Sequence, residues 1–285
     1  MFSYNPFSEL SATISPAIQQ WYVVLMVILV IGGTVLDMIH KKSAKYFFEN
    51  AEKAKKNAKR TVGAGEKAGI AVAVLANEVL TSGEFKNPRR RLSHLLTMYG
   101  TVLMIATTAI MIFGYPTAET PAPSILPTLW HLGALMLAVG GYWFWFSIRV
   151  DVSAEGLPWF RVERADLFIL SLLAMATFGL IWSWPQQSSG MSAGTWLFFA
   201  LFVISSTTLF GTVLWSKFAH MFFKPAAAFQ KRVTRADGSM ENLPPLEFDL
   251  SDPALQAKFP DIPEYMGKNP PYMGKGIRRE KASHY

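Results

Sequence analysis

The stretch RRRLSHLLTMYGTVLMIATTAIMIFG, residues 89–114, decides the fold of this chain. Three arginines open it, and an apolar run follows that is long enough to cross a membrane as a helix, which takes about 20 residues. Four further runs have the same length and character, so we expect an all-α integral membrane bundle of five transmembrane helices. The predicted spans are residues 20–39, 94–114, 128–148, 166–184 and 195–219.

The composition agrees with this class. Of 285 residues, 51% are hydrophobic and 14% aromatic, which is too apolar for an ordinary soluble domain. The sequence has no cysteine, so the chain ligates no iron–sulfur cluster and forms no disulfide of its own. It also lacks the phosphate-binding, zinc-protease and serine-hydrolase motifs of soluble enzymes.

The positive charges predict the orientation in the membrane. Of 27 Lys and Arg residues, 13 lie in 41–91, three in 149–164 and 11 from Lys217 onward, whereas loops 115–127 and 185–194 have none. Because cytoplasmic loops carry the excess of Lys and Arg, we expect the N-terminus outside and the C-terminus in the cytoplasm. The expected location is the bacterial inner (cytoplasmic) membrane. The net charge of +7 then reflects sidedness, and no nucleic-acid partner is expected.

Four segments follow from this topology. Residues 1–40 hold the N-terminal segment and the first span, 41–93 a cytoplasmic basic loop with short amphipathic helices, 94–219 spans two to five, and 220–285 a cytoplasmic extension. The extension repeats PEYMGK as PPYMGK and is rich in proline, glycine and charge. It is either a disordered tail or a peptide that binds a soluble partner. The partner-binding side chains would be Tyr265, Met266, Tyr272 and Met273.

The histidines predict a cofactor site. Of five, His40, His94 and His220 lie at the predicted cytoplasmic ends of spans, and His131 lies at the outer face. Heme b in a helical membrane protein takes two neutral imidazoles from two helices at one depth. His94 and His220 are therefore candidate axial ligands, and His40 is an alternative ligand. Interfacial histidines without any cofactor explain the same pattern.

The remaining candidates surround that site. Arg89, Arg90 and Arg91 could pair with heme propionates. A single outer histidine limits the chain to at most one bis-histidine heme, and no other metal is expected. Asp37, an acid within the first span, and His131 are candidates for the vicinity of a quinone substrate. Asp37 could instead pair with Lys41, and His131 could be purely structural.

Two runs resemble a known group of proteins. LANEVLTSGEFKNPRRRLSHLLTMYGTVLMIATT (75–108) and SKFAHMFFKPAAAFQKR (216–232) are similar to the cytochrome b-type membrane subunits of the nitrate reductase gamma and heterodisulfide reductase families. On that likeness His94 and His220 match the heme-ligand positions. Within the group, the compact cysteine-free chain most resembles membrane anchor subunits that accompany adenylylsulfate (APS) reductase.

The resemblance implies a function and partners. The chain would link a cytoplasmic iron–sulfur flavoprotein complex, the APS reductase alpha and beta subunits, to the quinone pool in the lipid membrane. The partner would oxidise sulfite, and this chain would perform no sulfur chemistry, although it could take part in quinone reduction. Diheme members of the group carry two histidine pairs, and this sequence supplies only one. The alternatives are a purely structural anchor without a redox centre and a cytochrome b subunit of another respiratory dehydrogenase.

The charge pattern yields a labelling prediction. The chain has no native cysteine, so single cysteines report sidedness directly. In intact cells, Ser124→Cys should react with a membrane-impermeant thiol reagent and Ser251→Cys should not. After the cells are opened, both should react. Labelling of Ser251→Cys but not of Ser124→Cys in intact cells would overturn the assigned orientation.

Overall fold

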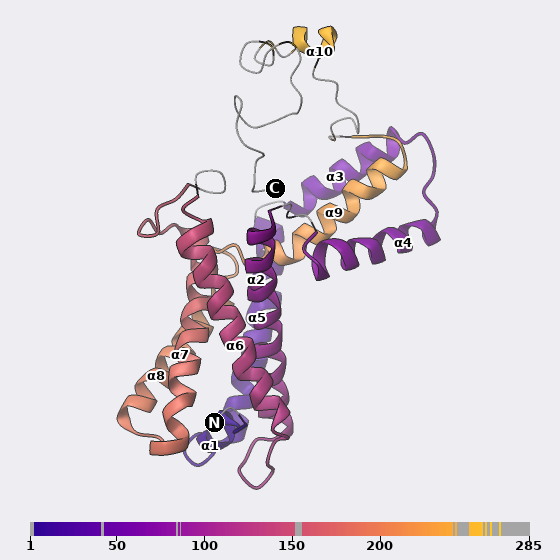
Figure 1. Cartoon of the computed structure of the whole chain (residues 1–285). Helices are drawn as coiled ribbons and strands as arrows, with labels where there is room; N and C mark the ends of the chain where they lie inside the picture. The colour runs from indigo at the N-terminus through magenta and orange to yellow at the C-terminus, as the bar shows by residue number, and fades with distance from the viewer. Residues whose placement is uncertain are drawn as a thin grey trace. The chain divides into compact units, whose positions relative to one another are not determined.

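The structure, a computed structural model, is built of helices and turns, and the residues that it describes include no strand (Figure 1). It describes residues 3–40, 43–83, 85, 87–151, 156–241, 243, 251–258, 260, 263 and 268. The elements are α1 (Pro6–Leu10), α2 (Pro16–His40), α3 (Ser43–Lys56), α4 (Ala64–Val74), η1 (Leu75–Leu80), α5 (Pro88–Gly114), α6 (Ile125–Trp143), η2 (Phe144–Ile148), η3 (Arg164–Asp166), α7 (Leu167–Ser189), α8 (Ala193–Gly211), α9 (His220–Ala236) and α10 (Pro253–Lys258).

The predicted all-α class and the five spans are confirmed. Five helices are long and apolar enough to cross a membrane, as expected of a multi-pass membrane protein. They are Pro16–His40, Pro88–Gly114, Ile125–Ile148, Arg164–Gln186 and Ala193–Gly211. Which compartment each end faces stays a prediction.

The boundaries differ most from the prediction at two places. The helix of the second span begins at Pro88, because proline is well suited to the first helical position. The three arginines at 89–91 therefore lie inside this helix. The last spanning helix ends at Gly211 instead of residue 219. Just beyond this end, Ser216 Oγ accepts from Phe218 N at 3.2 Å, a local side-chain turn that competes with continued helix.

The chain forms two compact units. The first comprises Met1–Ala44, Arg89–Asp151 and Glu155–Phe223, and it contains all five spanning helices. The second comprises Lys45–Pro88, Val152–Ala154 and Lys224–Tyr285. The predicted partner-binding residues Tyr265, Met266, Tyr272 and Met273 lie outside the described residues.

Within the first unit, α5 and α6 pack backbone against backbone in antiparallel orientation. A Cβ atom added to Gly100 would lie 2.5 Å from Leu137 N and 2.6 Å from Gly133 O. Added to Gly140, it would lie 2.7 Å from Ser93 O. Small residues allow such close approach between membrane helices. The Ser93 hydroxyl donates to Gly140 O at 2.8 Å, which fixes the register.

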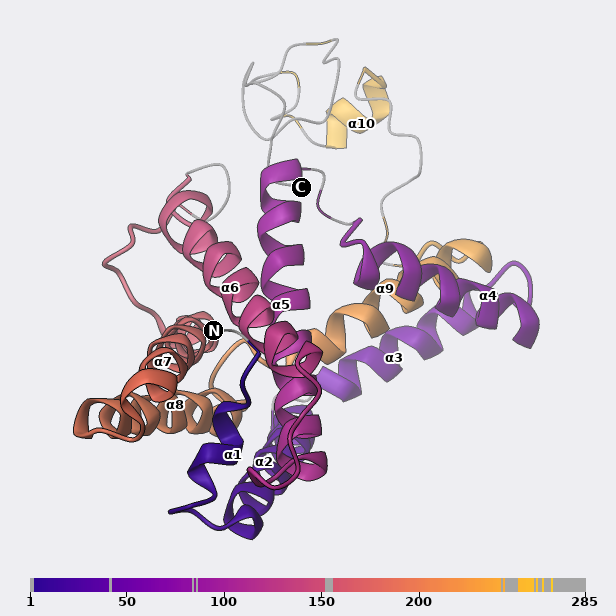
Figure 2. The same cartoon turned by 60° about the horizontal axis from the view of Figure 1, so that its bottom comes forward.

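The other antiparallel helix pairs are α6 with α7 and α7 with α8. Gly141 lies against Leu173 of α7, and a Cβ atom there would be 2.6 Å from Leu173 Cδ2. Farther along, Trp182 of α7 stacks on Phe202 of α8 with ring centroids 5.5 Å apart. Figures 1 and 2 both show α7 and α8 side by side. Consecutive spans from α5 to α8 therefore alternate in direction, as successive membrane crossings must.

The first span, α2, packs parallel to α8. The Tyr22 hydroxyl lies 2.7 Å from Ser206 Oγ, and farther along, a Cβ atom on Gly33 would meet Val213 Cβ at 2.8 Å. Much of the rest of α2 is apolar and uncovered by the chain, including Leu25, Ile28 and Ile31 in its middle. Such a surface is suited to hydrocarbon and not to water.

The N-terminal segment closes one end of this bundle. Asn5 Nδ2 donates to Tyr115 O at 3.0 Å, and the Tyr4 hydroxyl donates to Gln186 Oε1. Burial raises the pKa of the Tyr4 phenol, with a smaller contribution from the Glu9 carboxylate. The N-terminus and the loops around 115 and 186 therefore share one end of the unit, as the predicted topology requires.

The second unit joins α3, η1 and α9. The backbone N–H groups of Lys59 and Arg60 donate to Asp237 O at 2.8 and 3.2 Å, just beyond the ends of α3 and α9. Arg232 of α9 donates to Glu78 of η1 at 2.8 Å. Both views show α3 and α9 side by side (Figures 1 and 2). These are the segments in which short amphipathic helices and the start of the C-terminal extension were expected.

The α5–α6 contact yields a stability prediction. Gly100→Ala should lower the thermal unfolding midpoint, because the new methyl group meets backbone atoms and overpacking costs about 1–3 kcal/mol. Gly32→Ala is the matched control, since nothing lies within 4 Å of that position. Alanine is favoured over glycine within helices by about 1 kcal/mol, so the control should not be destabilised. Circular dichroism in detergent measures both, and equal midpoints would contradict the close packing.

Candidate functional site

His94 lies near the start of α5, half-buried, at the level of Gly140 on α6. Its neighbour Ser93 sets this level through the bond to Gly140 O. Arg89, Arg90 and Arg91 occupy the turn before it. The arginines are thus at the end of the helix, where side chains reach the membrane surface.

His220 is the first residue of α9 and lies against the start of α7. Its ring meets Phe168 edge to face, with centroids 5.6 Å apart. Phe168 adjoins Ile169, which packs at the level of Gly141 on α6. His220 Nδ1 hydrogen-bonds Lys217 O. Because a carbonyl only accepts, Nδ1 is the protonated nitrogen in this hydrogen bond.

The two predicted ligands therefore lie at the same end of the first unit, each next to a residue at neighbouring levels of α6. Ser93 marks Gly140 as the level of His94, and Phe168 marks the adjacent Gly141 as the level of His220. His40, the alternative ligand, is the exposed last residue of α2. Equal depth is the arrangement that two imidazoles on one heme iron require.

The imidazoles of His94 and His220 are suitable ligands for heme iron, but the nearby glycines leave no space for a porphyrin. A porphyrin between helices needs small residues that leave the backbone open. At Gly100 and Gly140 that space is filled by the backbone of the neighbouring helix, and at Gly141 by Leu173. Their function in this structure is helix packing. A heme on these histidines would have to be accommodated without the α5–α6 contact opening.

The two quinone-vicinity candidates are both buried, at different ends of the unit. Asp37 lies on the face of α2 that also carries Gly33, one turn before His40. His131 lies near the start of α6, beside Trp130 in the core. The structure does not bring Asp37 and His131 together at one site.

Both ring nitrogens of His131 are engaged inside the bundle. Nδ1 lies 2.7 Å from Pro127 O, and Nε2 lies 3.0 Å from Ser183 Oγ on α7. The Pro127 carbonyl accepts from Nδ1–H, and Nε2 lies within hydrogen-bonding distance of the Ser183 hydroxyl, which also donates to Leu180 O at 3.1 Å. This geometry is that of a structural histidine that ties α6 to α7, one of the readings that the sequence left open.

Sequence reasoning missed an ion pair near the histidine level. Arg149, directly after η2, donates to Asp166 at the start of α7 at 2.6 Å, and both are buried. The sequence did indicate this pair, because Arg149 directly follows one predicted span and Asp166 begins the next. Among the described residues, no group of three or more His, Asp and Glu side chains could hold a metal ion.

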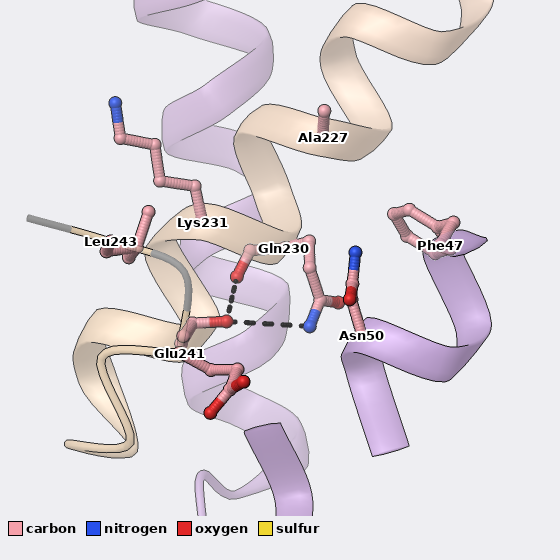
Figure 3. A pocket seen from close by; sticks show the side chains of 8 residues that line it. Phe47, Asn50, Ala227, Gln230, Lys231, Glu241 and Leu243 are labelled. Atoms are coloured by element: carbon pink, nitrogen blue, oxygen red, sulfur yellow. Dashed lines mark hydrogen bonds between the residues drawn. The ribbon is translucent and has the colours of Figure 1, made fainter. Parts of the chain in front are cut away.

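The second unit contains a groove between α3 and α9 (Figure 3). Its lining residues are Phe47, Asn50, Ala227, Gln230, Lys231, Thr234, Glu241 and Leu243. The Thr234 hydroxyl donates to Gln230 O at 2.9 Å, and Asn57 donates to Glu241 Oε2 at 2.9 Å. These polar groups serve the packing of the unit itself.

No family model, curated protein or solved structure matches this chain.

The geometry of His131 yields a prediction. His131→Leu should lower the free energy of unfolding by about 1–3 kcal/mol, because Ser183 Oγ and Pro127 O lose a buried partner. Denaturant titration in detergent measures this. The matched variant His40→Leu changes an exposed residue and should leave stability nearly unchanged. If His131→Leu matches the wild type, the two bonds do not hold α6 to α7.

Proposed function

We propose that this chain is the membrane anchor and electron-transfer subunit of a respiratory complex in the bacterial inner membrane. It would link a cytoplasmic iron–sulfur flavoenzyme to the quinone pool. The observation that supports this proposal best is the position of His94 and His220 at the same end of a five-helix bundle. Two imidazoles at one depth are the minimal protein contribution to a six-coordinate heme b.

In this proposal, each group of residues has its own role. His94 and His220 would hold the iron, and the Lys217 carbonyl orients His220 through its Nδ1–H. Arg89, Arg90 and Arg91 would bind the propionates as charge-assisted partners. A bound heme b would carry single electrons between the partner's clusters and a quinone. The chain has no cysteine, so the clusters belong to the partner.

The resemblance to APS reductase anchors suggests the partner and its reaction. Sulfite and AMP would combine to adenylylsulfate on the soluble subunits, with the loss of two electrons. A quinone that takes up those two electrons and two protons becomes a quinol. This chain would bind the partner at the lysine- and arginine-rich end of the bundle and perform no sulfur chemistry.

A second function, a structural anchor without a redox centre, is favoured by a different observation. Gly100 and Gly140 are closed by the α5–α6 contact, so the bundle is packed where a porphyrin would need room. In that case His94 and His220 are interfacial residues, and the partner passes electrons to quinone without help from this chain.

Replacement of His94 and His220 distinguishes the electron-transfer subunit from the structural anchor. In the complex purified from membranes, His94→Leu and His220→Leu should each abolish the reducible heme bands of the visible spectrum. Quinone reduction driven by sulfite and AMP should fall to background, while the chain stays membrane-inserted. His131→Leu is the matched control and should keep the spectrum, because that ring is engaged by Pro127 and Ser183.

Two results would refute the redox proposal. One is a wild-type complex without any heme band that nevertheless reduces quinone. The other is normal turnover in both the His94 and the His220 variants. Either result leaves the structural anchor as the function of the chain.

A further inference from the structure

The loop of residues 156–163, which precedes η3 and α7, is folded around one buried guanidinium, that of Arg149. Nη2 donates to Asp166 Oδ2 and to Arg161 O, both at 2.6 Å. Nη1 donates to Pro158 O at 2.8 Å, and the Trp145 ring lies 4.2 Å from the guanidinium carbon. A buried charge is tolerated only when it is paired and hydrogen-bonded. These partners therefore hold the loop in one conformation at the end of α6.

This fixed loop presents its apolar side chains outward. Trp159 is 57% exposed, Phe160 70% and Val162 59%. The hydrogen bonds of Arg149 run to the backbone of the same loop, at Pro158 and Arg161. Thus the polar backbone faces inward and the aromatic rings face outward. In water, a rigid loop with this arrangement is unfavourable unless something apolar covers it.

The outward rings continue a row of aromatic residues on the spanning helix. Tyr142 stacks on Phe146 with centroids 6.1 Å apart, Phe146 lies 6.3 Å from Trp159, and Trp159 lies 5.7 Å from Phe160. Phe146 is itself 54% exposed and lies in the last turn of the candidate span Ile125–Ile148. The exposed surface of the loop is therefore continuous with the lipid-facing surface of α6 and η2.

We propose that residues 157–162 are an interfacial membrane anchor that inserts Trp159 and Phe160 into the headgroup region of the bilayer. Aromatic side chains favour this zone, and tryptophan in particular combines an apolar body with a polar N–H. Arg149 positions the loop, since its bonds to Pro158, Arg161 and Asp166 set the angle at which the rings leave the end of α6.

The attachment is apolar and not electrostatic. Residues 149–166 carry three arginines and four acidic residues, so their formal net charge is −1. Arg161 and Glu163 also form an exposed pair at 3.4 Å. Anionic lipid therefore gains little from the loop, and insertion should occur in zwitterionic bilayers and resist salt.

A nitroxide on Phe160→Cys tests the anchor in the full-length protein. The chain has no other cysteine, so the label is site-specific. In vesicles of phosphatidylcholine, the ratio of the collision rate with oxygen to that with a water-soluble nickel chelate should exceed the ratio for a label in water, and it should not change between low and high salt. Ile28→Cys, on the uncovered face of α2, sets the value for hydrocarbon, and Glu119→Cys, in an exposed loop, sets the value for water.

The ratio at position 160 should lie between the values of the two controls and clearly above that of Glu119→Cys, as expected of the headgroup region. A ratio equal to that of Glu119→Cys would overturn the proposal, because the loop would then stand in water. A label shielded from both reagents would also overturn it, since the loop would then be covered by protein, either a partner or a second copy of this chain. Heme content plays no part in this measurement, so its result does not depend on the proposed redox function.

Discussion

The backbone contact between α5 and α6 is the constraint on which the first unit depends. Lipid is as apolar as the side chains that face it, so membrane helices associate through close packing and hydrogen bonds and not through exclusion of water. Gly100, Gly133 and Gly140 permit that packing, and the Ser93 hydroxyl fixes its register on Gly140 O. Because α7 packs on α6 and α8 packs on α7, the α5–α6 pair determines the position of the other two helices along the membrane normal.

That register has opposite consequences for a cofactor. It places His94 beside Gly140, one residue from the Gly141 level of Ile169, whose neighbour Phe168 contacts His220. The same contact leaves no space for a porphyrin beside Gly100 and Gly140. A heme held by His94 and His220 would therefore have to lie away from these two glycines. If none is bound, the packing of α5 against α6 is undisturbed.

The sequence predicted the helical class and the five spans because length and hydropathy are local properties that a lipid environment imposes strictly. It could not tell whether a glycine faces a cofactor or another helix, since both uses require only the missing Cβ, as at Gly100. The role of His131 was equally hidden, because its partner Ser183 is 52 residues away on another span. The ends at Pro88 and Gly211 depended on proline and hydroxyl side chains, which a hydropathy window averages out.

The two ends of the bundle stabilise their buried polar groups by different chemistry. At the end that holds the N-terminus, the network consists of neutral side chains, with Asn5 bonded to Tyr115 O and Tyr4 bonded to Gln186. At the other end, a full charge is buried in the Arg149–Asp166 pair. Arginine is expensive to move through hydrocarbon, whereas uncharged amides and phenols cost much less. An end whose segments lack Lys and Arg can be translocated, and an end that carries them stays on the side of synthesis, as the predicted orientation requires.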